Sequence, residues 1–335
     1  MNQSNTELSR FKLESSAGEE ERDLFAFAIR EGFSREQKSL PCRYLYDDEG
    51  SRLFEAIGEQ PEYYLMRCER EILDLQGAAI AECLTRGSDG VEFVELGAGN
   101  SSKTKVLLQA LHGQIAALRY VPIDVNADVM RRGVGSWSHE MEHLQVLALA
   151  MGYDEGIARL QQVPAAGRRV LAWLGSSAAN MGRDETASAL RFFGSCLGAG
   201  DRVLLGIDKR KDPKRIEAAY DDSAGVSAAF AKNLLTRVNS EFGANFDIEA
   251  FDYLAEYDNE LGRVGMYLVS RKAQEVRLAA LDWTVTFAAG ERLHTEDSYK
   301  YSIQEIEELG KASGLTLEQS WLDTESLYAV ALLRR

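Results

Sequence analysis

The sequence of 335 residues is poor in cysteine and histidine, and neither residue type is arranged as a metal site. The four cysteines follow no disulfide or metal-ligand spacing: Cys42, Cys68, Cys83 and Cys196. Among the four histidines, His139 and His143 are four residues apart, but no third ligand lies near them, so a solvated helix face is the better interpretation. We therefore expect a reducing, cytoplasmic environment and no metal.

Long apolar runs, an excess of basic charge, internal repeats and low-complexity tracts are also absent. No apolar run approaches the roughly 18 residues needed to cross a bilayer, and the polar, acidic N-terminus lacks the apolar core of a signal peptide. The net charge of −15 argues against nucleic acid or an anionic membrane as partner. The remaining composition, 45% hydrophobic and 27% charged, is typical of a globular protein of one or two domains. We expect a small-molecule substrate and take a monomer as the starting expectation.

Residues 91–104, VEFVELGAGNSSKT, predict a strand, a glycine turn and the start of a helix. Gly97 and Gly99 let the backbone turn sharply and approach a ligand closely. A phosphate-binding P-loop and a dinucleotide fingerprint each need a glycine where Ser102 stands. An acid followed by a loose glycine turn fits S-adenosylmethionine, the cofactor of class I methyltransferases, best. A glycine turn that binds no ligand is the plain alternative.

The apolar runs predict an α/β fold with a parallel sheet, in which five strands follow one another in the first two thirds of the chain and two more come near its end. Strands separated by helical stretches are expected at residues 91–96, 119–125, 144–150, 169–174 and 201–207. A helix at 303–312 and strands at 315–322 and 327–333 complete the seven-stranded, Rossmann-like sheet of a class I methyltransferase.

The rest of the chain is expected to form a second, substrate-binding lobe from residues 1–65 and 210–299, beside a cofactor-binding core of residues 66–209 and 300–335. Within that lobe, residues 1–22 read as a mobile lead-in. Residues 209–245 read as helical, and short strands follow at 248–255, 264–270 and 276–287.

In a parallel sheet, ligands lie beyond the carboxyl ends of the strands. That edge collects the glycine turn, Asp124 at the tip of the next strand, Tyr153 with Asp154, and residues 175–180. An aspartate at the second strand tip can accept hydrogen bonds from both hydroxyls of a ribose, and a helix-capping aspartate is the alternative.

Several stretches resemble the histidine-specific N-α-methyltransferases of the ergothioneine pathway, over nearly the whole chain. The similar stretches include YLYDDEGSRLFEAIGEQPEYY, CEREIL, VELGAGNSSKT, LGSSAAN, AAYDDSAGVSAAF and LHTEDSYKYS. The resemblance implies an enzyme that trimethylates the α-amine of L-histidine with S-adenosylmethionine, giving hercynine.

The resemblance also implies the site residues. The cofactor would contact Gly97, Gly99, Lys103, Asp124 and Tyr153. The substrate would contact Tyr46, Tyr63, Asn180, Tyr220, Met266, Glu296 and Ser298. In this assignment Asn180 holds the α-amine end, Tyr46 lies near the reacting nitrogen, and Tyr220 contacts the carboxylate. The imidazole would be bound by Tyr63, Glu296 and Ser298, beside Met266. For each residue alone, a place in the core or at a helix cap is the plain alternative.

The sequence departs from the family pattern in two places. The family usually has Gly-Ser-Thr-Ile-Gly-Asn after the fourth strand, whereas here Ala179 precedes Asn180. The family often has Gly-Asp-Phe after the third strand, whereas this chain has Met151 to Asp154, with Tyr153 as a flat stacking surface.

Alignment of nitrogen, methyl carbon and sulfur would account for most of the catalysis, so we expect no strong dedicated base. Tyr46 or a water molecule would orient the amine. The alternatives are a related N-methyltransferase acting on another amino acid or amine, a nicotinamide-dependent oxidoreductase, and a non-catalytic S-adenosylmethionine-binding module.

Overall fold

The structure is a computed structural model that describes residues 11–15 and 18–335. The chain divides into two compact units. Among the described residues, unit 1 comprises Phe11–Ser15, Leu65–Arg210 and Lys300–Arg335, and unit 2 comprises Gly18–Tyr64 and Lys211–Tyr299. Each unit has its own sheet, and the two are described in turn.

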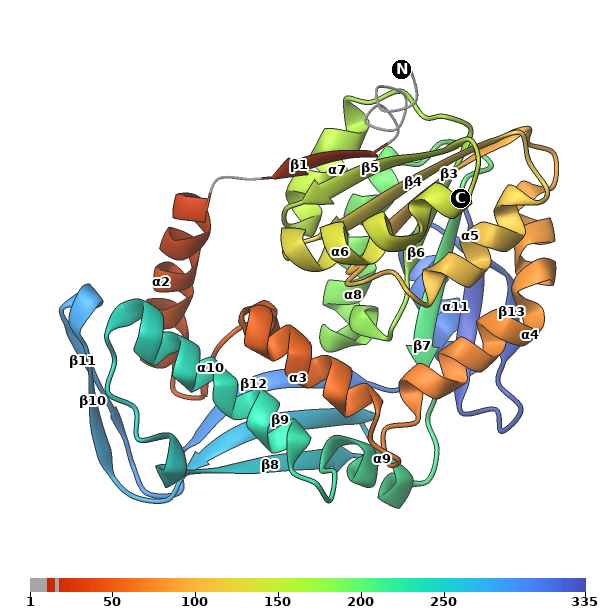
Figure 1. Ribbon diagram of the computed structural model, residues 1–335. Coiled ribbons are helices and arrows are strands. Elements are labelled where there is room, and N and C mark those ends of the chain that lie inside the picture. Colours follow the sequence, from red (N-terminus) through yellow and green to blue (C-terminus); the bar gives the residue numbers. More distant parts are fainter. Residues whose placement is uncertain (1–10, 16–17) are drawn as a thin grey trace. The chain divides into compact units, whose positions relative to one another are not determined.

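Unit 1 is built on an eight-stranded sheet in the order β1-β5-β4-β3-β6-β7-β14-β13 (Figure 1). The strands are β1 (Phe11–Ser15), β3 (Gly90–Leu96), β4 (Ala117–Asp124), β5 (Leu144–Ala150), β6 (Arg168–Trp173), β7 (Arg202–Asp208), β13 (Thr316–Leu322) and β14 (Tyr328–Arg334). From β1 to β7 all neighbours are parallel, and β14 is antiparallel to both of its neighbours. The predicted α/β fold with a mainly parallel central sheet is confirmed.

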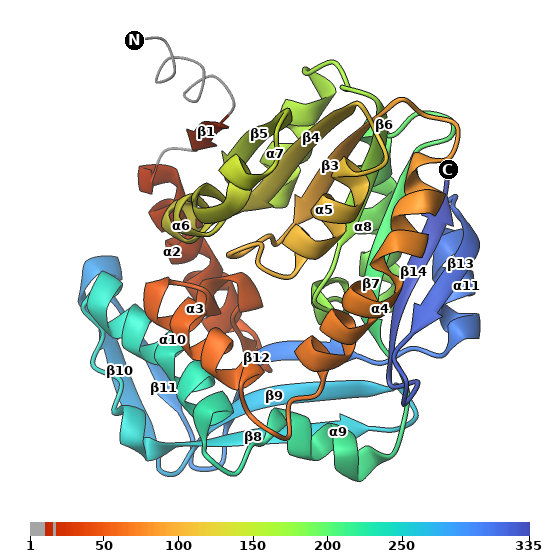
Figure 2. The ribbon, with the colours of Figure 1, turned by 45° about the vertical axis from the view of Figure 1, so that its right-hand side comes forward.

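The central strand β3 shows why the sheet forms where the apolar runs predict it. All seven of its residues are buried, as expected for a parallel strand covered on both faces. The covering helices are α4 (Leu65–Thr85), α5 (Thr104–His112), α6 (Ala127–Trp137), α7 (Tyr153–Gln161), α8 (Arg183–Phe193) and α11 (Ile303–Ala312). In Figure 2, α4 and α5 lie in front of the sheet, and α8 and α11 lie behind it.

The first strand corrects two sequence-based expectations. Residues 11–15 were expected in a lead-in of the second lobe, and the sheet was expected to have seven strands. Instead β1 pairs in parallel with β5, with Phe11 opposite Val146, and adds an eighth strand to unit 1. Arg159 donates to Glu14 at 2.7 Å and lowers the pKa of that carboxyl to about 2. A five-residue edge strand carries too little periodicity to be recognised before its partner is known. The rest of the expected lead-in up to residue 10 lies outside the described residues.

Unit 2 is built on a four-stranded sheet in the order β2-β12-β9-β8, with a separate hairpin of β10 and β11. Its strands are β2 (Lys38–Ser39), β8 (Phe251–Asp258), β9 (Arg263–Ser270), β10 (Gln274–Leu278), β11 (Trp283–Phe287) and β12 (Arg292–Tyr299). Its helices are α2 (Gly18–Ser34), α3 (Asp48–Gly58), α9 (Pro213–Tyr220) and α10 (Val226–Phe242). Helices α3 and α10 run side by side on one face of this sheet (Figures 1 and 2).

The helical stretch expected at residues 209–245 is two helices in the structure. Asp222 accepts hydrogen bonds from the backbone of Val226 and Ser227, and Gly225 caps α10 with a φ of 74°. Asp221, with a φ of −133° and a ψ of 69°, lies outside the helical region and ends α9, and the left-handed Gly225 then starts α10 in a new direction. The break places Tyr220 at the carboxyl end of α9.

The part of the chain that the structure describes contains no candidate for a membrane-spanning helix or a metal site. None of the helices in residues 18–335 is long and apolar enough to cross a membrane. Among the residues with described coordinates, no group of three or more histidine, cysteine, aspartate or glutamate side chains is placed to hold a metal ion.

Candidate active site

The glycine turn after β3 is folded back onto the end of β4. The backbone N–H groups of Gly97 and Ala98 donate to the carbonyl of Ile123, at 2.9 and 3.3 Å. Gly97 and Gly99 both have left-handed φ angles, 68° and 52°. A Cβ atom added at Gly99 would meet no atom within 4 Å, whereas one at Gly97 would lie 2.7 Å from the hydroxyl of Tyr153. Gly99 therefore faces open space, as a turn that approaches a ligand must.

Asp124 links the tip of β4 to this turn. Its Oδ2 accepts from the N–H of Gly99 and its Oδ1 from the N–H of Asn126, both at 2.9 Å. Burial raises the pKa of Asp124, against the opposing effect of the backbone N–H groups that it accepts. A carboxylate has about four lone-pair sites, so these two contacts leave capacity for a ribose. Asp124 does not cap α6 (Ala127–Trp137), because the N-cap of that helix is Asn126, which accepts from the N–H of Val129. The ribose contact of Asp124 stays a prediction.

Glu95, the acid that precedes the turn, points into the core. It is fully buried and accepts hydrogen bonds from the hydroxyls of Thr104 and Tyr120. The Tyr120 hydroxyl also lies 2.7 Å from Ser101 Oγ. Burial raises the pKa of Glu95 to about 7, while Lys103 and the two hydroxyl donors lower it. Glu95 therefore supports the turn from beneath.

Lys103 at the start of α5 is held by a glutamate that the sequence did not single out. Its Nζ lies 2.7 Å from Glu69 Oε2, on α4. Glu69 Oε1 accepts from the N–H of Gly175 at 2.7 Å and from the hydroxyl of Tyr328 at 2.9 Å. Glu69 is only 1% exposed. It lies within CEREIL, and an acid between apolar residues of a buried helix face is the signal that could have found it.

The loop after β6 carries Asn180 at the end of a 3-10 helix, η3 (Ser177–Asn180). Gly175 and Ser176 both adopt left-handed φ angles, 77° and 60°, which turn the chain out of the strand. Ala179, where the family has glycine, is fully buried, is absent from the residues with positive φ, and donates its N–H to the carbonyl of Ser176. An alanine is therefore accommodated here without backbone strain. Asn180 is partly exposed.

Tyr153, at the start of α7, lies against the glycine turn. Its ring makes perpendicular contacts with Trp173 and Phe193, each with a centroid distance of 6.0 Å. Its hydroxyl is the atom that a side chain at Gly97 would meet. Asp154 is exposed on the first turn of the same helix. The segment after β5 thus places an aromatic ring against the glycine turn. Contact of this ring with the adenine stays a prediction.

The predicted substrate residues of unit 2 are brought together around Tyr220. Its hydroxyl lies 2.7 Å from Ser298 Oγ, and both side chains are buried. The ring of Tyr63 lies edge-on to that of Tyr220 at a centroid distance of 6.0 Å. On the neighbouring strands, Glu296 of β12 stands opposite Met266 of β9. Paired residues of an antiparallel ladder point to the same face, so this set forms one cluster.

A β-bulge sets which side chains of β12 join this cluster. The pairing of β12 with β9 shifts by one residue between His294 and Glu296. Thr295, the extra residue, donates its hydroxyl to the carbonyl of Met266 at 3.1 Å. After the bulge, Glu296 and Ser298 share the face of Met266. Without the bulge their side chains would point to the opposite face.

Tyr253 on β8 is a member of this cluster that the sequence did not indicate. Its hydroxyl donates to the backbone carbonyl of Tyr220 at 2.8 Å. Burial raises its pKa well above the ordinary value, and the charge of Glu296 raises it further. A tyrosine on an alternating strand carries no signal by itself, because only strand pairing shows what it faces.

Tyr46 is connected to the cluster around Tyr220 by a series of contacts between aromatic rings. Its ring lies edge-on to Phe54 and Phe230, at centroid distances of 5.4 and 5.3 Å. Phe54 in turn contacts Tyr63 edge-on at 6.5 Å. Phe54 and Phe230 were not predicted, although both lie in the stretches that carry the family resemblance.

The predicted residues thus fall into two sets. Unit 1 holds Asn180 and the five cofactor residues: Gly97, Gly99, Lys103, Asp124 and Tyr153. Unit 2 holds the other substrate residues: Tyr46, Tyr63, Tyr220, Met266, Glu296 and Ser298. The individual roles assigned to these residues stay predictions.

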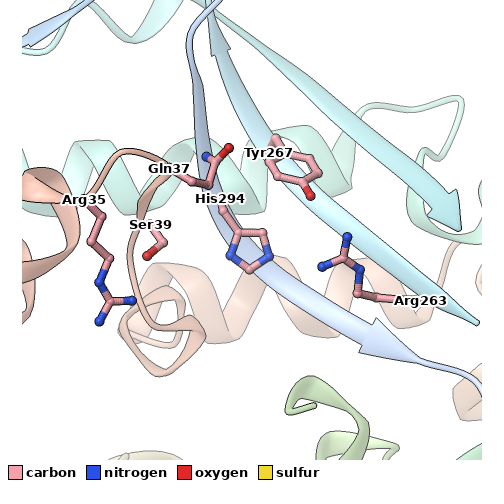
Figure 3. A pocket seen from close by; sticks show the side chains of 6 residues that line it. All are labelled: Arg35, Gln37, Ser39, Arg263, Tyr267 and His294. Atoms are coloured by element: carbon pink, nitrogen blue, oxygen red, sulfur yellow. The ribbon is translucent and has the colours of Figure 1, made fainter. Parts of the chain in front are cut away.

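A pocket of about 390 Å³ in unit 2 is distinct from this cluster. Figure 3 shows its lining residues: Arg35, Gln37, Ser39, Arg263, Tyr267 and His294. Tyr267 follows Met266 directly on β9, so the two side chains point to opposite faces of the sheet. His294 pairs with Tyr267 before the bulge and therefore shares its face. None of the predicted substrate residues lines this pocket.

Comparison with known proteins identifies the family of this chain. Residues 25–335 match the model of a family described as histidine-specific, S-adenosylmethionine-dependent methyltransferases. The chain is 39% identical to a histidine N-alpha-methyltransferase of Mycolicibacterium smegmatis, over 92% of this chain and 94% of that protein. It is 36% identical to the protein of the same name from Mycobacterium tuberculosis, over 93% of each chain. A 4-dimethylallyltryptophan N-methyltransferase of Epichloe festucae var. lolii is 26% identical, over 90% of this chain and 92% of that protein. The chain therefore belongs to the histidine-specific, S-adenosylmethionine-dependent methyltransferases.

Proposed function

We propose that this protein trimethylates the α-amino group of L-histidine to hercynine, with S-adenosylmethionine as methyl donor. The observation that supports this most directly is the cluster on the face of the unit 2 sheet that carries Met266. There a carboxylate, Glu296, and a buried hydroxyl pair, Tyr220 and Ser298, lie among aromatic rings. Relatives that share more than a third of their residues with this chain carry the name histidine N-alpha-methyltransferase.

The chemistry of the cluster suits an imidazole. A neutral imidazole donates from one ring nitrogen and accepts at the other, so it needs an acceptor and a donor. Glu296 supplies an acceptor, and the hydroxyl of Ser298 supplies a donor. An amino acid without an imidazole could not form these hydrogen bonds, and a buried site that is built for polar contacts discriminates strongly against a ligand that lacks them.

The residues of unit 1 fit the cofactor. Gly99 opens to free space at the turn, and Asp124 at the next strand tip keeps lone pairs available. In this proposal Asp124 holds the ribose, Lys103 holds an anionic group of the cofactor, and Tyr153 lies beside the adenine. When bound, S-adenosylmethionine supplies an electrophilic methyl group on a sulfonium.

The remaining work of the protein is to position the amine and to tolerate its growing positive charge. An α-amino group with a pKa near 8 needs little help to lose its proton, so no dedicated base is required. Tyr46 orients the nitrogen and passes its proton to water. The rings of Tyr46 and Tyr63 offer faces to the methylated ammonium, each such contact contributing about 0.5–2 kcal/mol.

The test is incubation of the purified protein with S-adenosylmethionine and each of the twenty amino acids, followed by mass spectrometry. We expect gains of one to three methyl groups on histidine alone. Product from another amino acid would replace the substrate in this proposal. N-methylation of another amino acid or amine is the second candidate function, because one relative is named a 4-dimethylallyltryptophan N-methyltransferase. No product with any amino acid would favour a non-catalytic cofactor-binding module.

A pair of matched variants tests the role of Glu296. We expect Glu296→Gln to raise the KM for histidine about ten-fold or more, as for the loss of a hydrogen bond to a charged group. Glu256 is a glutamate of the same sheet that pairs with Gly265 on the opposite face and binds Arg292. Glu256→Gln is therefore the control and should leave the KM within two-fold. Equal KM values for the two variants would remove Glu296 from the imidazole site.

A further inference from the structure

We propose that Glu69 is a positioning residue that holds the cofactor side of the site and the loop carrying Asn180 in one hydrogen-bonded unit. This inference rests on the proposed function, since it takes Lys103 as a cofactor contact and Asn180 as a substrate contact. It concerns a residue of α4 whose side chain is only 1% exposed.

The contacts of Glu69 reach three elements that are far apart in the sequence. Oε2 binds Lys103 Nζ at 2.7 Å, at the start of α5. Oε1 accepts from the N–H of Gly175 at 2.7 Å, where the Asn180 loop leaves β6, and from Tyr328 on β14. The Glu69 carboxylate therefore fixes the position of the Lys103 ammonium and of the first N–H group of the Asn180 loop.

Two glycines leave the space that the Glu69 carboxylate and the Lys103 ammonium occupy. A Cβ atom at Gly206 of β7 would lie 2.2 Å from Glu69 Oε1, and one at Gly175 would lie 2.8 Å from Lys103 Nζ. No real side-chain atom fits at such distances, so both glycines are needed for the charge pair to occupy this place.

The charge of Glu69 is also what orients Lys103. The lysine side chain is 27% exposed, whereas Glu69 is 1% exposed, so the lysine has access to solvent and the glutamate does not. Without a partner, an ammonium on a flexible stem favours water over a partly buried position. With Glu69 in place, the ammonium stays at the edge where the turn opens.

The discriminating variant is Glu69→Gln. The glutamine carbonyl still accepts from Gly175, while the attraction for Lys103 is lost. We expect the dissociation constant for S-adenosylmethionine, measured by calorimetry without histidine, to rise about ten-fold. The KM for histidine at saturating cofactor should stay within about three-fold. Glu69→Ala, which also releases Gly175, should raise both.

Glu92→Gln is the matched control. Glu92 is a fully buried glutamate of β3 that binds Arg169 and Arg119, at 2.6 and 2.8 Å. It lies four residues before Leu96, about 13 Å along the strand from its carboxyl end. This variant should lower the melting temperature and leave cofactor binding within two-fold. If Glu69→Gln and Glu92→Gln change stability and cofactor binding alike, Glu69 is an ordinary buried ion-pair member and the proposal is wrong.

A double-mutant cycle with Lys103→Met tests whether Glu69 acts through Lys103. We expect the double variant to bind the cofactor no more weakly than Lys103→Met alone. Additive losses would overturn the proposed route. Because calorimetry measures cofactor binding alone, the result stands even where the wild-type protein fails to methylate histidine, so failure of the proposed function is seen separately.

Discussion

Replacing Glu95 by glutamine should remove a pH dependence of stability that the fold imposes on the wild-type protein. Glu95 is fully buried under the glycine turn, and burial raises its pKa from its usual 4.5 to about 7. Between these values the folded protein keeps a proton that the unfolded chain has lost. Since the folded state binds more protons there, its stability falls as the pH rises, which is opposite to the behaviour of a salt-bridged carboxylate.

The size of the effect follows from the two pKa values. A difference of about 2.5 pH units, at about 1.4 kcal/mol per unit, amounts to about 3 kcal/mol over the whole range. Between pH 5 and pH 8, about 2.5 kcal/mol of this is lost. Glutamine does not titrate, but it replaces one of the two acceptor oxygens that serve Thr104 and Tyr120. That loss lowers stability equally at both pH values, by about 1–2 kcal/mol.

The assay is urea unfolding of both proteins at pH 5 and pH 8, with the difference between them taken at each pH. Titration of all other groups cancels in this difference, because both proteins share them. We expect the wild type to lose about 2.5 kcal/mol more than Glu95→Gln between the two conditions. Parallel changes in the two proteins would show that Glu95 titrates alike in the folded and unfolded states, and would refute the reasoning.

Three further predictions concern the turn and the substrate cluster. Gly97→Ala should lower the free energy of unfolding by about 1–2 kcal/mol because Gly97 has a left-handed φ, and further because the new Cβ would lie 2.7 Å from the Tyr153 hydroxyl. Adding Tyr153→Phe removes that hydroxyl, so it should restore part of the melting temperature and of the cofactor affinity. No recovery in the double variant would show that the contact is harmless. Tyr46→Phe should lower kcat much more than it raises the KM for histidine, and an unchanged kcat would exclude its role at the nitrogen. Tyr220→Phe and Ser298→Ala should each cost about 1–2 kcal/mol by chemical denaturation, and because they share one 2.7 Å hydrogen bond the double variant should cost less than their sum.

The central sheet of unit 1 was accessible from the sequence because its signal is local. A strand buried on both faces is mostly apolar, and the run of β14 shows this directly. The strand β3 follows the same pattern apart from two buried glutamates, Glu92 and Glu95, which bind partners in the core. The same holds for helix starts with a side-chain cap, as at Ser302, which accepts from the N–H of Glu305. The edge strand β1 has no such signal, since its place depends on pairing with β5, more than a hundred residues away.

The candidate site likewise contains residues that the sequence reveals and residues that only the fold reveals. The glycine turn and Asp124 were found from their spacing, because a ligand-binding turn imposes its own residue types. The substrate residues of unit 2 were found only through family resemblance, since a tyrosine or methionine in an alternating strand is equally typical of a core. Tyr253, Phe54 and Phe230 were missed because only the pairing of β8 and the packing of α3 on α10 reveal what they face.

By itself the sequence determined the class of fold, the place of the glycine turn and the family, because each depends on short stretches whose residue types are constrained locally. The tertiary structure decided what those stretches contact. It turned Glu95 inward under the turn, placed Glu69 between Lys103 and Gly175, and used a bulge at Thr295 to set the face of Glu296. Contacts between residues so distant along the chain are fixed by packing and strand register, which a local pattern does not encode.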